Sequence, residues 1–256
     1  MPTRPLVLCL SGLDPSGGAG LQADIETVAA LGGHVLGLVT ALTVQDTRNV
    51  AEVAATDPEL LRRQLDLLLR DCRPQAVKLG LLGSAGQFGV ILDLLQTCGV
   101  PVVCDPVLRA GGGARLLDPT AGAALRRTLF PAVTLLTPNA AEARLLCPGA
   151  ADLDACGREL LEAGCANVLI TGGDEPADDV VNSWYAAGRA PQRYRWPRLP
   201  ETFHGAGCTL AAALAALLAQ GLDTAAALQR AQEWTLQALR RAQTVGRGRR
   251  IPGRAA

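Results

Sequence analysis

The chain has 256 residues, of which 49% are hydrophobic and only 3% aromatic, so we expect residues 1–256 to form one domain with a core of Leu, Val and Ala. Its 24 Lys and Arg residues balance 24 Asp and Glu residues. This zero formal charge excludes a general electrostatic attraction to nucleic acid or to a membrane surface, and we expect neither as a partner.

Short apolar runs alternate with segments of helical periodicity in the first half of the chain. The expected strands are residues 6–10, 35–39, 76–79 and 100–104. The expected helices are the segment after Gly18, residues 60–69, which follow an Asp57-Pro58 pair typical of a helix start, and residues 88–95. This order favours parallel strands joined by helices.

The second half continues this pattern and then departs from it. Residues 133–136 and 168–170 are expected strands, and residues 154–163 form an expected helix. Residues 180–196 are typical of a hairpin that turns at Ala187-Gly188-Arg189. Two closing helices follow, over residues 206–220 and 223–242, and the Gly/Arg-rich tail of residues 246–256 is expected to be frayed. The whole pattern predicts an α/β fold with a mostly parallel sheet and helices on both faces.

Polar and glycine-rich segments follow the expected strands. They are residues 11–20, 105–113, 137–142, 171–174 and 202–208. Ligands bind beyond the carboxyl ends of the strands in sheets of this kind, so we expect one crevice to collect all five segments.

Residues 202–209 are the most informative segment, because a turn of small residues there opens a long Ala/Leu helix. Backbone N–H groups at a helix start are unpaired and carry the positive end of the helix dipole, and Gly205 and Gly207 let an anion approach them closely. Cys208 stands beside that anion, and the helix start is expected to lower its pKa if a pocket exposes the thiol. The alternatives are that Cys208 is a small buried residue and that His204 is an ordinary packing or surface residue.

Residues 11–20 start the first helix and are rich in glycine. They lack the Gly-Lys-Ser/Thr ending of a P-loop and the GxGxxG spacing of a dinucleotide fingerprint, which disfavours a dinucleotide-binding oxidoreductase. On composition alone this segment is a flexible turn, and Asp24 in the following helix is a solvated acid.

Three further segments carry side chains suited to ligands, each with a simpler alternative. Gln45 offers a donor and an acceptor to the edge of a heteroaromatic ring, or faces water as a loop residue. Asp105 at a strand end holds magnesium, or makes a turn before Pro106. Asn139 and Glu142 share one helical face, where Glu142 holds magnesium at nucleotide phosphates through water, or the pair only caps the helix.

The eight cysteines show no CxxC spacing, and a chain of this length needs no disulfides for stability. We expect most of them to be small buried side chains in a reducing compartment. The N-terminal apolar run is too short for a signal peptide or a membrane span, so we expect a cytoplasmic location.

Six motifs follow one another along nearly the whole chain. They are GLDPSGGAGLQAD at 12–24, TALTVQDTR at 40–48, VKLG at 77–80, DPV at 105–107, TPN with Glu142 at 137–142, and HGAGCT at 204–209. Each motif is modest alone, but the ordered set resembles the ribokinase-like superfamily and, more narrowly, the bacterial hydroxymethylpyrimidine/phosphomethylpyrimidine kinases of thiamine biosynthesis. Cys208 stands where the sugar kinases of this superfamily carry an aspartate.

The resemblance implies a ribokinase-like three-layer fold, ATP and Mg²⁺ as cofactors, and a homodimer. It implies phosphorylation of the 5-hydroxymethyl group of 4-amino-5-hydroxymethyl-2-methylpyrimidine by ATP, and a second transfer that converts the monophosphate to the diphosphate. In the second step the acceptor is already ionised at neutral pH, so no strong base is needed. We therefore prefer Cys208 as a positioning residue of the anion hole, with proton abstraction as the sharper alternative.

By carry-over from the family, the implied site has four parts. The anion hole that carries catalysis is Gly205, Ala206, Gly207 and Cys208. The pyrimidine pocket is Gln45, Asp24, Gly12 and Val107. The ATP-binding residues are Asp105, Asn139, Thr171, Gly172, Gly173 and His204, and the magnesium site is Glu142 with Asp105.

The chain departs from the family pattern at three places. Thr171 stands where a lysine often precedes Gly-Gly, Arg109 lies in a loop that usually offers a lysine, and Ala206 replaces a usual threonine. Two alternative functions stay open, which are a pyridoxal kinase and a non-catalytic pyrimidine-binding sensor derived from the kinase. Gln45 favours the pyrimidine substrate, and the intact Asn139, Glu142 and 205–208 set favours catalysis.

Overall fold

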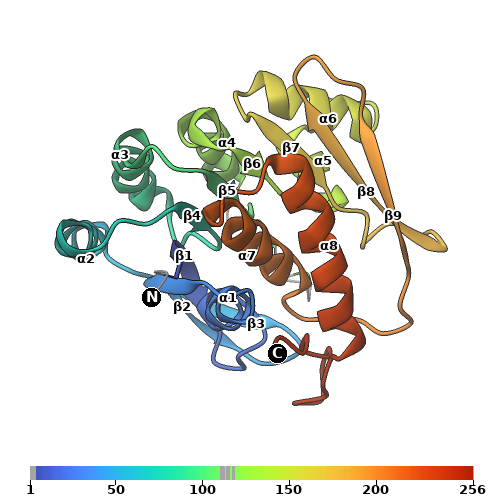
Figure 1. The fold of residues 1–256 in the computed structure, drawn as a ribbon, viewed down its shortest axis with the longest axis horizontal. Helices are drawn as coiled ribbons and strands as arrows, with labels where there is room; N and C mark the ends of the chain where they lie inside the picture. Colours follow the sequence, from blue (N-terminus) through green and yellow to red (C-terminus); the bar gives the residue numbers. More distant parts are fainter. Residues whose placement is uncertain (1–3, 110–112, 114–115, 117–118, 256) are drawn as a thin grey trace.

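One sheet runs through the centre of the molecule, and in the described part of the chain its strands are ordered β3-β2-β1-β4-β5-β6-β7-β8-β9 (Figure 1). The computed structural model describes residues 4–109, 113, 116 and 119–255. The strands are β1 Leu6–Leu13, β2 His34–Gln45, β3 Val50–Ala55, β4 Ala76–Leu79, β5 Val102–Cys104, β6 Leu135–Leu136, β7 Asn167–Ile170, β8 Asp179–Ala186 and β9 Gln192–Pro197. The helices are α1 Gly20–Ala30, α2 Pro58–Asp71, α3 Phe88–Cys98, α4 Pro119–Thr128, α5 Ala140–Leu146, α6 Leu153–Glu162, α7 Ala206–Ala219 and α8 Thr224–Arg240, with 3₁₀ turns at Ala85–Gln87 and Phe130–Ala132.

The central strands are parallel and the outer ones are not. Strand β1 pairs in parallel with β2 and β4, and the parallel pairing continues through β5 and β6 to β7. Strand β3 is antiparallel to β2, and β8 and β9 extend the other side as an antiparallel hairpin. The parallel strands place their carboxyl ends at one edge, so the loops that follow them meet there.

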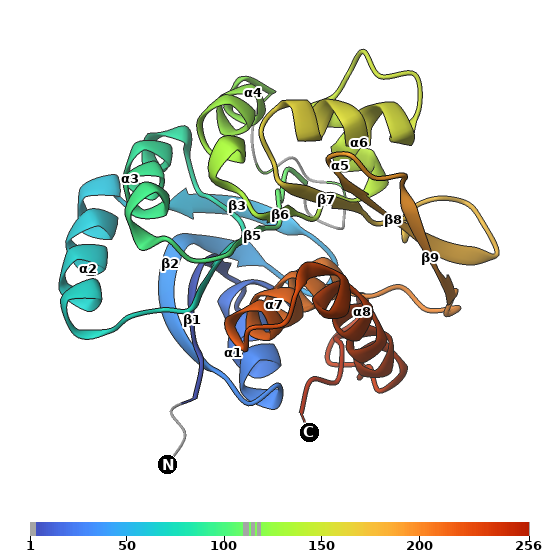
Figure 2. The same ribbon diagram turned by 45° about the horizontal axis from the view of Figure 1, so that its top comes forward.

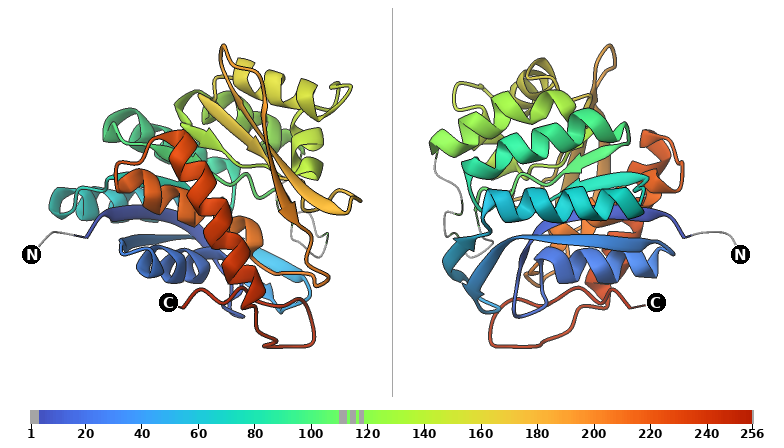
Figure 3. Two further views of the ribbon diagram at one scale, coloured as in Figure 1. Left: turned by 45° about the vertical axis from the view of Figure 1, so that its right-hand side comes forward. Right: turned by 90° about the vertical axis from the view of Figure 1, so that its left-hand side faces the viewer.

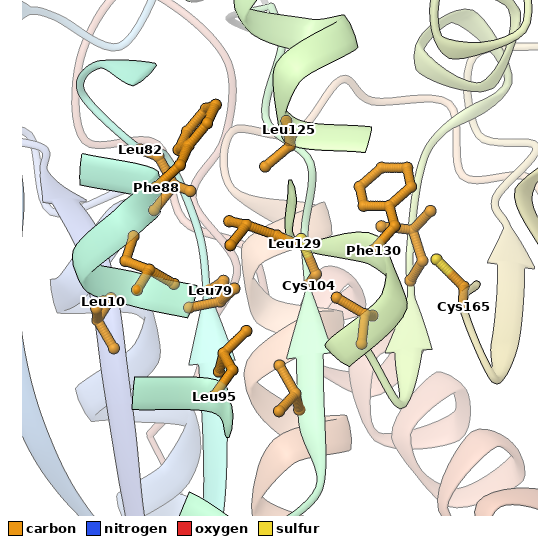
Figure 4. Packing of buried hydrophobic residues seen from close by; sticks show 14 of the residues in the cluster. Leu10, Leu79, Leu82, Phe88, Leu95, Cys104, Leu125, Leu129, Phe130 and Cys165 are labelled. Carbon is orange, nitrogen blue, oxygen red and sulfur yellow. The ribbon is translucent and has the colours of Figure 1, made fainter. Parts of the chain in front are cut away.

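Alternating side chains of β1 show how the sheet divides the core. Leu8 and Leu10 join an apolar cluster under α2 to α6, while Val7 and Cys9 join a second cluster under α1, α7 and α8. Figure 2 shows these two helical layers on opposite faces of the sheet, and the right-hand view of Figure 3 faces the α2, α3 and α4 side. Figure 4 shows the first cluster, where Leu79, Leu129 and Phe130 are almost completely buried. The α/β three-layer prediction is therefore confirmed.

Helix α7 is buried because it packs against β1, β4 and β5 as well as against α1 and α8. Its residues 209–218 are all buried, which explains why the sequence of this helix is apolar on every side. A buried helix has a fixed position, so its N-terminus can hold a precise place at the edge of the sheet. No helix in the described part of the chain combines the length and apolar character needed to span a bilayer.

The sequence pattern misplaced several elements. Residues 40–45 continue β2 instead of forming a loop, because they pair with β3. The sequence pattern did not predict strand β3. Helix α4 was also missed, and β5 and β6 are shorter than expected. The hairpin prediction is confirmed, with Gly188 at the turn in a positive φ of 70°.

The prediction of a frayed tail is wrong for residues 246–255. Gln243 and Ile251 pair through their backbones, and the N–H of Arg250 donates to the carbonyl of Thr202 at 3.0 Å. The left-hand view of Figure 3 shows this dark red segment turning back after α8 towards the blue N-terminal elements. The tail is ordered because Arg254, only 1% exposed, finds buried acceptors at its end.

Candidate active site

Contacts between distant segments gather the strand-end loops at the carboxyl edge. A Cβ on Gly205 would lie 1.9 Å from the carbonyl oxygen of Gly18, and one on Gly207 would lie 3.9 Å from the carboxylate of Asp105. Asn139 and Thr171 form a backbone bridge at the same edge. These segments therefore meet at one edge of the sheet, although residues 110–112 lie outside the described residues, and the single crevice stays a prediction.

The N-terminus of α7 has no side-chain cap. Gly205 is its N-cap residue and has a φ of 82°, which favours glycine. The N–H of Thr209 is the first to pair within the helix, with the carbonyl of Gly205 at 2.9 Å. The N–H groups of Ala206, Gly207 and Cys208 precede that bond and have no intrahelical partner, so they are suited to hold an anion.

Cys208 lies where the starts of two helices meet. The Cys208 sulfur lies close enough to the N–H of Gly20, at the start of α1, and to the carboxylate of Asp105 for both to affect its pKa. Burial, together with the charge of Asp105, raises the pKa of Cys208 to about 12. The expectation that a helix start lowers this pKa is wrong here, because burial and a neighbouring carboxylate outweigh the dipole. The sulfur therefore carries a proton at neutral pH.

A buried ion pair lies behind Cys208. The Nζ atom of Lys78 is 2.9 Å from Oδ1 of Asp24 and 3.0 Å from Oγ of Ser11, and both charged side chains are fully buried. Burial alone would lower the pKa of Lys78, but the charge of Asp24, aided by Asp105, raises it above the usual range. Asp24 is thus neither the solvated acid of the simpler alternative nor exposed to a ligand, and it supports the site through Lys78.

Asp14 is the centre of a second polar group, which we call the Asp14 cluster: Asp14, Ser16, Gln45 and His204. The Nε2 atom of His204 lies 2.7 Å from Oδ2 of Asp14, and the N–H and hydroxyl of Ser16 donate to Oδ1 at 2.8 and 2.7 Å. Burial opposes the charge of this carboxylate, yet hydrogen bonds from His204, Gln45 and Ser16 hold the pKa of Asp14 well below its usual range. Since Asp14 stays ionised, its partner nitrogen of His204 carries a proton.

The Asp14 cluster borders an open cavity of about 470 Å³. The cavity is lined by Pro15, Ser16, Gln45, Asp46, Thr47, Arg48, Gly246 and Arg247. His204 therefore lies with the residues predicted to hold the pyrimidine, 3.5 Å from Nε2 of Gln45, although the resemblance placed it among the ATP-binding residues. Gly12 lies nearby, where a Cβ would meet the Leu81 side chain at 2.9 Å.

The Glu142 cluster, formed by Asp105, Asn139 and Glu142, lies at the start of α5. Asn139 and Glu142 make a reciprocal capping box, so the capping alternative is correct as far as it goes. The N–H of Leu108 also donates to Glu142, at 3.3 Å. Burial, followed by the charge of Asp105, nevertheless raises the pKa of Glu142 to about 8, and burial raises the pKa of Asp105 as well.

Two neighbouring carboxylates whose pKa values are both raised are a suitable environment for a divalent cation. Among the residues described, no group of three or more His, Cys, Asp or Glu side chains is placed to hold a metal ion. Mg²⁺ usually takes only one or two carboxylates and completes its shell with water and phosphate oxygens, so Asp105 and Glu142 fit that ion.

The remaining predicted residues fall beside these clusters. Thr171 accepts at its carbonyl from the N–H of Ala140, and the N–H of Gly172 donates to Asn182 at 3.0 Å, which anchors this loop at the start of α5. Gly173 is exposed next to it, and Val107 follows Asp105 and is partly exposed. Both lie where a ligand can reach them.

Sequence reasoning gave no role to Asp14, Lys78, Asp174 or Arg254. Asp174 accepts from the N–H of Ala141 at 2.9 Å and so caps α5 from outside its own segment. The Asp-Pro-Ser-Gly pattern at 14–17 was a detectable sign of an Asx-type turn around Asp14. The contacts of Lys78 and Arg254 depend on tertiary structure and left no local signal.

The fold is that of the ribokinase-like kinases, α/β enzymes that transfer phosphoryl groups to small molecules. The sequence model of the phosphomethylpyrimidine kinase family matches residues 14–252. The chain therefore belongs to the phosphomethylpyrimidine kinase family.

Full-length relatives agree with this assignment. The hydroxymethylpyrimidine/phosphomethylpyrimidine kinase of Escherichia coli is 40% identical over 253 residues, covering 94% of each chain. The enzyme of the same description from Synechococcus elongatus is 39% identical over 250 residues, covering 95% of each.

Solved structures share the fold. The pyridoxal kinase of Staphylococcus aureus in complex with pyridoxal has a TM-score of 0.89 at 26% identity, over 99% of this chain and 94% of that one. The phosphomethylpyrimidine kinase of Clostridium difficile 630 has a TM-score of 0.80 at 28% identity, over 92% of this chain and all of that one.

Proposed function

We propose that this protein transfers the γ-phosphoryl group of ATP to the hydroxymethyl group of 4-amino-5-hydroxymethyl-2-methylpyrimidine, and then phosphorylates the monophosphate to the diphosphate. The observation that carries this proposal is the uncapped N-terminus of α7, with Cys208 held between the N–H of Gly20 and the carboxylate of Asp105. Such a site stabilises a transferring phosphoryl group by fixed dipoles.

The Asp14 cluster is suited to hold the pyrimidine. The Nε2 atom of Gln45 lies 3.5 Å from Nε2 of His204, beside Asp14, so the carboxamide oxygen can accept from a 4-amino group. Gly12 and Val107 complete the pocket in this proposal. The ring is then oriented by a side chain that is itself held by an ionised carboxylate.

The Glu142 cluster is suited to the nucleotide. Asn139, Thr171, Gly172 and Gly173 would border ATP, and Asp105 and Glu142 would hold Mg²⁺, which when bound neutralises charge on the nucleotide phosphates. A bound cation would favour the ionised form of Glu142, whose pKa is raised by burial beside Asp105. The α7 N–H groups then face the phosphoryl group that is transferred.

We assign Cys208 to positioning rather than to proton abstraction. A thiol with a pKa of about 12 is protonated at neutral pH and so cannot accept the proton of the hydroxymethyl group. It can donate to Asp105 and hold the α7 start against α1. This role serves both transfers, because the second acceptor needs no base.

The proposal is tested by incubating the protein with Mg-ATP and, separately, the hydroxymethylpyrimidine, its monophosphate and pyridoxal, while following ADP release. We expect turnover with the first two. Turnover with pyridoxal alone would favour the pyridoxal kinase alternative, which the fold similarity supports but at only 26% identity against 40% for the pyrimidine kinases. No turnover with any substrate would favour a non-catalytic sensor and overturn the proposal.

We also propose a homodimer in the cytoplasm. Leu42 and Val44 on β2 are 55% and 59% exposed and lie on the same side of the strand, which is an apolar surface suited to a second copy. All eight cysteines are free thiols, in keeping with a reducing compartment. Light scattering on the Leu42→Glu variant tests the dimer, and a native molecular mass that equals the monomer's for the unmodified chain would contradict it.

A further inference from the structure

Arg254 is a charged side chain that is completely buried at the end of the ordered tail. Its Nε donates to Oγ1 of Thr209 at 2.9 Å, one terminal nitrogen donates to the carbonyl of Gly17 at 3.3 Å, and the other donates to the carbonyl of Gly18. The first terminal nitrogen also lies 3.1 Å from a carboxylate oxygen of Glu26. One guanidinium thus joins the glycine-rich loop after β1 to the first turn of α7.

The bond to Thr209 continues to the N-cap of α7. The Thr209 hydroxyl donates its proton to the carbonyl of Gly205 at 2.7 Å, and a lone pair of its oxygen accepts from Arg254. The proton and the accepting lone pair of this hydroxyl therefore both have fixed partners. The chain from Arg254 through Thr209 to Gly205 fixes the rotation of the turn that carries the free N–H groups.

The two segments that Arg254 joins are in close contact. A Cβ on Gly18 would lie 2.2 Å from Cδ2 of His204, and one on Gly205 would lie 2.9 Å from a terminal nitrogen of Arg254. Gly18 is two residues before Gly20, whose N–H contacts the Cys208 sulfur. A shift of the glycine-rich loop would therefore separate the two helix starts that meet at Cys208.

We propose that Arg254 is a positioning residue for phosphoryl transfer, which holds the 17–18 carbonyls against the 205–209 turn so that the N–H groups at the start of α7 keep their place around the anion. The proposal rests on the proposed kinase function. Its mechanism is orientation, because the groups that Arg254 contacts are not among those assigned above to the pyrimidine, the nucleotide or the transferred phosphoryl group. It predicts a loss in kcat with little change in KM.

The test compares Arg254→Met and Arg254→Lys with Arg250→Ala. Arg250 is an exposed arginine of the same tail that pairs with Glu201 at 3.2 Å, so it controls for changes in the tail alone. We expect Arg254→Met to lower kcat about 100-fold while KM for ATP and for the pyrimidine stays within about threefold. Arg254→Lys keeps the charge but loses the planar fork, and we expect kcat about 10-fold below the unmodified protein. Arg250→Ala should match the unmodified protein.

Amide hydrogen exchange gives a readout that does not depend on turnover. We expect faster exchange in residues 14–20 and 203–210 of both Arg254 variants, and unchanged exchange there in Arg250→Ala. If Arg254→Met does not fold, Arg254→Lys decides, since native kcat and native exchange in that variant would overturn the proposal. An unmodified protein without turnover would instead contradict the kinase function, while the exchange data would still judge the role of Arg254.

Discussion

Asp14 and Glu142 are equally buried, each with 5% of its surface exposed, yet their charges are controlled in opposite ways. The pKa of Asp14 is held well below its usual range, whereas that of Glu142 is raised to about 8. Burial opposes the charge of both carboxylates: hydrogen bonds outweigh it at Asp14, whereas at Glu142 burial and the charge of Asp105 prevail.

The two clusters differ in what faces the carboxylate. Asp14 accepts from the N–H groups of Ser16 and Ala19, from the Ser16 hydroxyl and from His204. Glu142 accepts from two backbone N–H groups but faces the negative charge of Asp105. Asp14 is thus ionised without any ligand and holds the loop around it through hydrogen bonds. Glu142 would be stabilised in its ionised form by a bound cation.

The largest effect is expected from a substitution of Lys78. Among the described residues, Lys78 is the positive side chain whose charge lowers the pKa of Asp105. Lys78→Met leaves Asp24 buried without a counter-charge and should lower the free energy of unfolding by about 3–5 kcal/mol. It should also raise the pKa of Asp105 further, so that this carboxylate is protonated as readily as that of Glu142. Urea unfolding measures the loss, and Lys78→Met with Asp24→Leu should recover most of it.

The matched control for Lys78 is Arg62, whose pair with Asp93 is 2.9 Å long but half-exposed. Arg62→Met should cost less than about 1 kcal/mol, because exposed pairs contribute little. Equal losses in Lys78→Met and Arg62→Met would show that burial of the ion pair is not what matters.

Glu142→Gln is expected to lower kcat about 100-fold, since it removes a carboxylate suited to Mg²⁺. The ligand-free variant should nevertheless be more stable, by up to about 5 kcal/mol at pH 8. The unfolded chain ionises Glu142 near pH 4.3 and the folded chain near pH 8, so the folded protein binds more protons and loses stability between these values. Thermal melts from pH 5 to 8.5 should show a gap that widens with pH, and a constant gap would contradict the raised pKa.

Asp14→Asn should have the opposite pH dependence. The ionised carboxylate accepts from His204 and Ser16, and its loss should cost about 2–3 kcal/mol at pH 7. The depressed folded pKa means that this contribution is complete above about pH 4 and disappears as the pH falls through the folded pKa. Denaturant unfolding at pH 3 to 7 measures it, with the exposed Asp66→Asn as a control that should change little. A difference that grows below pH 4 would reverse the assignment.

The smallest effect is expected from Cys208→Ala, which keeps every α7 N–H group and removes only the thiol contacts with Gly20 and Asp105. Both transfers should slow equally, by less than about 10-fold, because the anion site remains. Steady-state rates with the hydroxymethylpyrimidine and with its monophosphate measure this. Loss of the first transfer with survival of the second would restore the role of Cys208 as a base.

Local patterns were enough to predict the layers of the fold and the strand-end loops, because hydrophobic periodicity and glycine position act within a few residues. The motifs around Gln45, Asn139 and Cys208 were found in this way. The direction of the Cys208 pKa shift could not be predicted in this way. It depends on burial and on Asp105, a residue 103 positions away in the sequence. The order of the tail was missed for the same reason, because its composition resembles a frayed end and only the acceptors of Arg254 reveal its position.

The bond between Arg254 and Gly17 spans 237 positions of the chain. On a ribosome that adds roughly 5–20 residues per second, the glycine-rich loop waits about 10–50 s before its guanidinium partner has been synthesised. A nascent chain can form its sheet during that interval, but the turn at Gly205 still lacks the contacts with Arg254. This active site would therefore reach its final arrangement only after Arg254 has been synthesised.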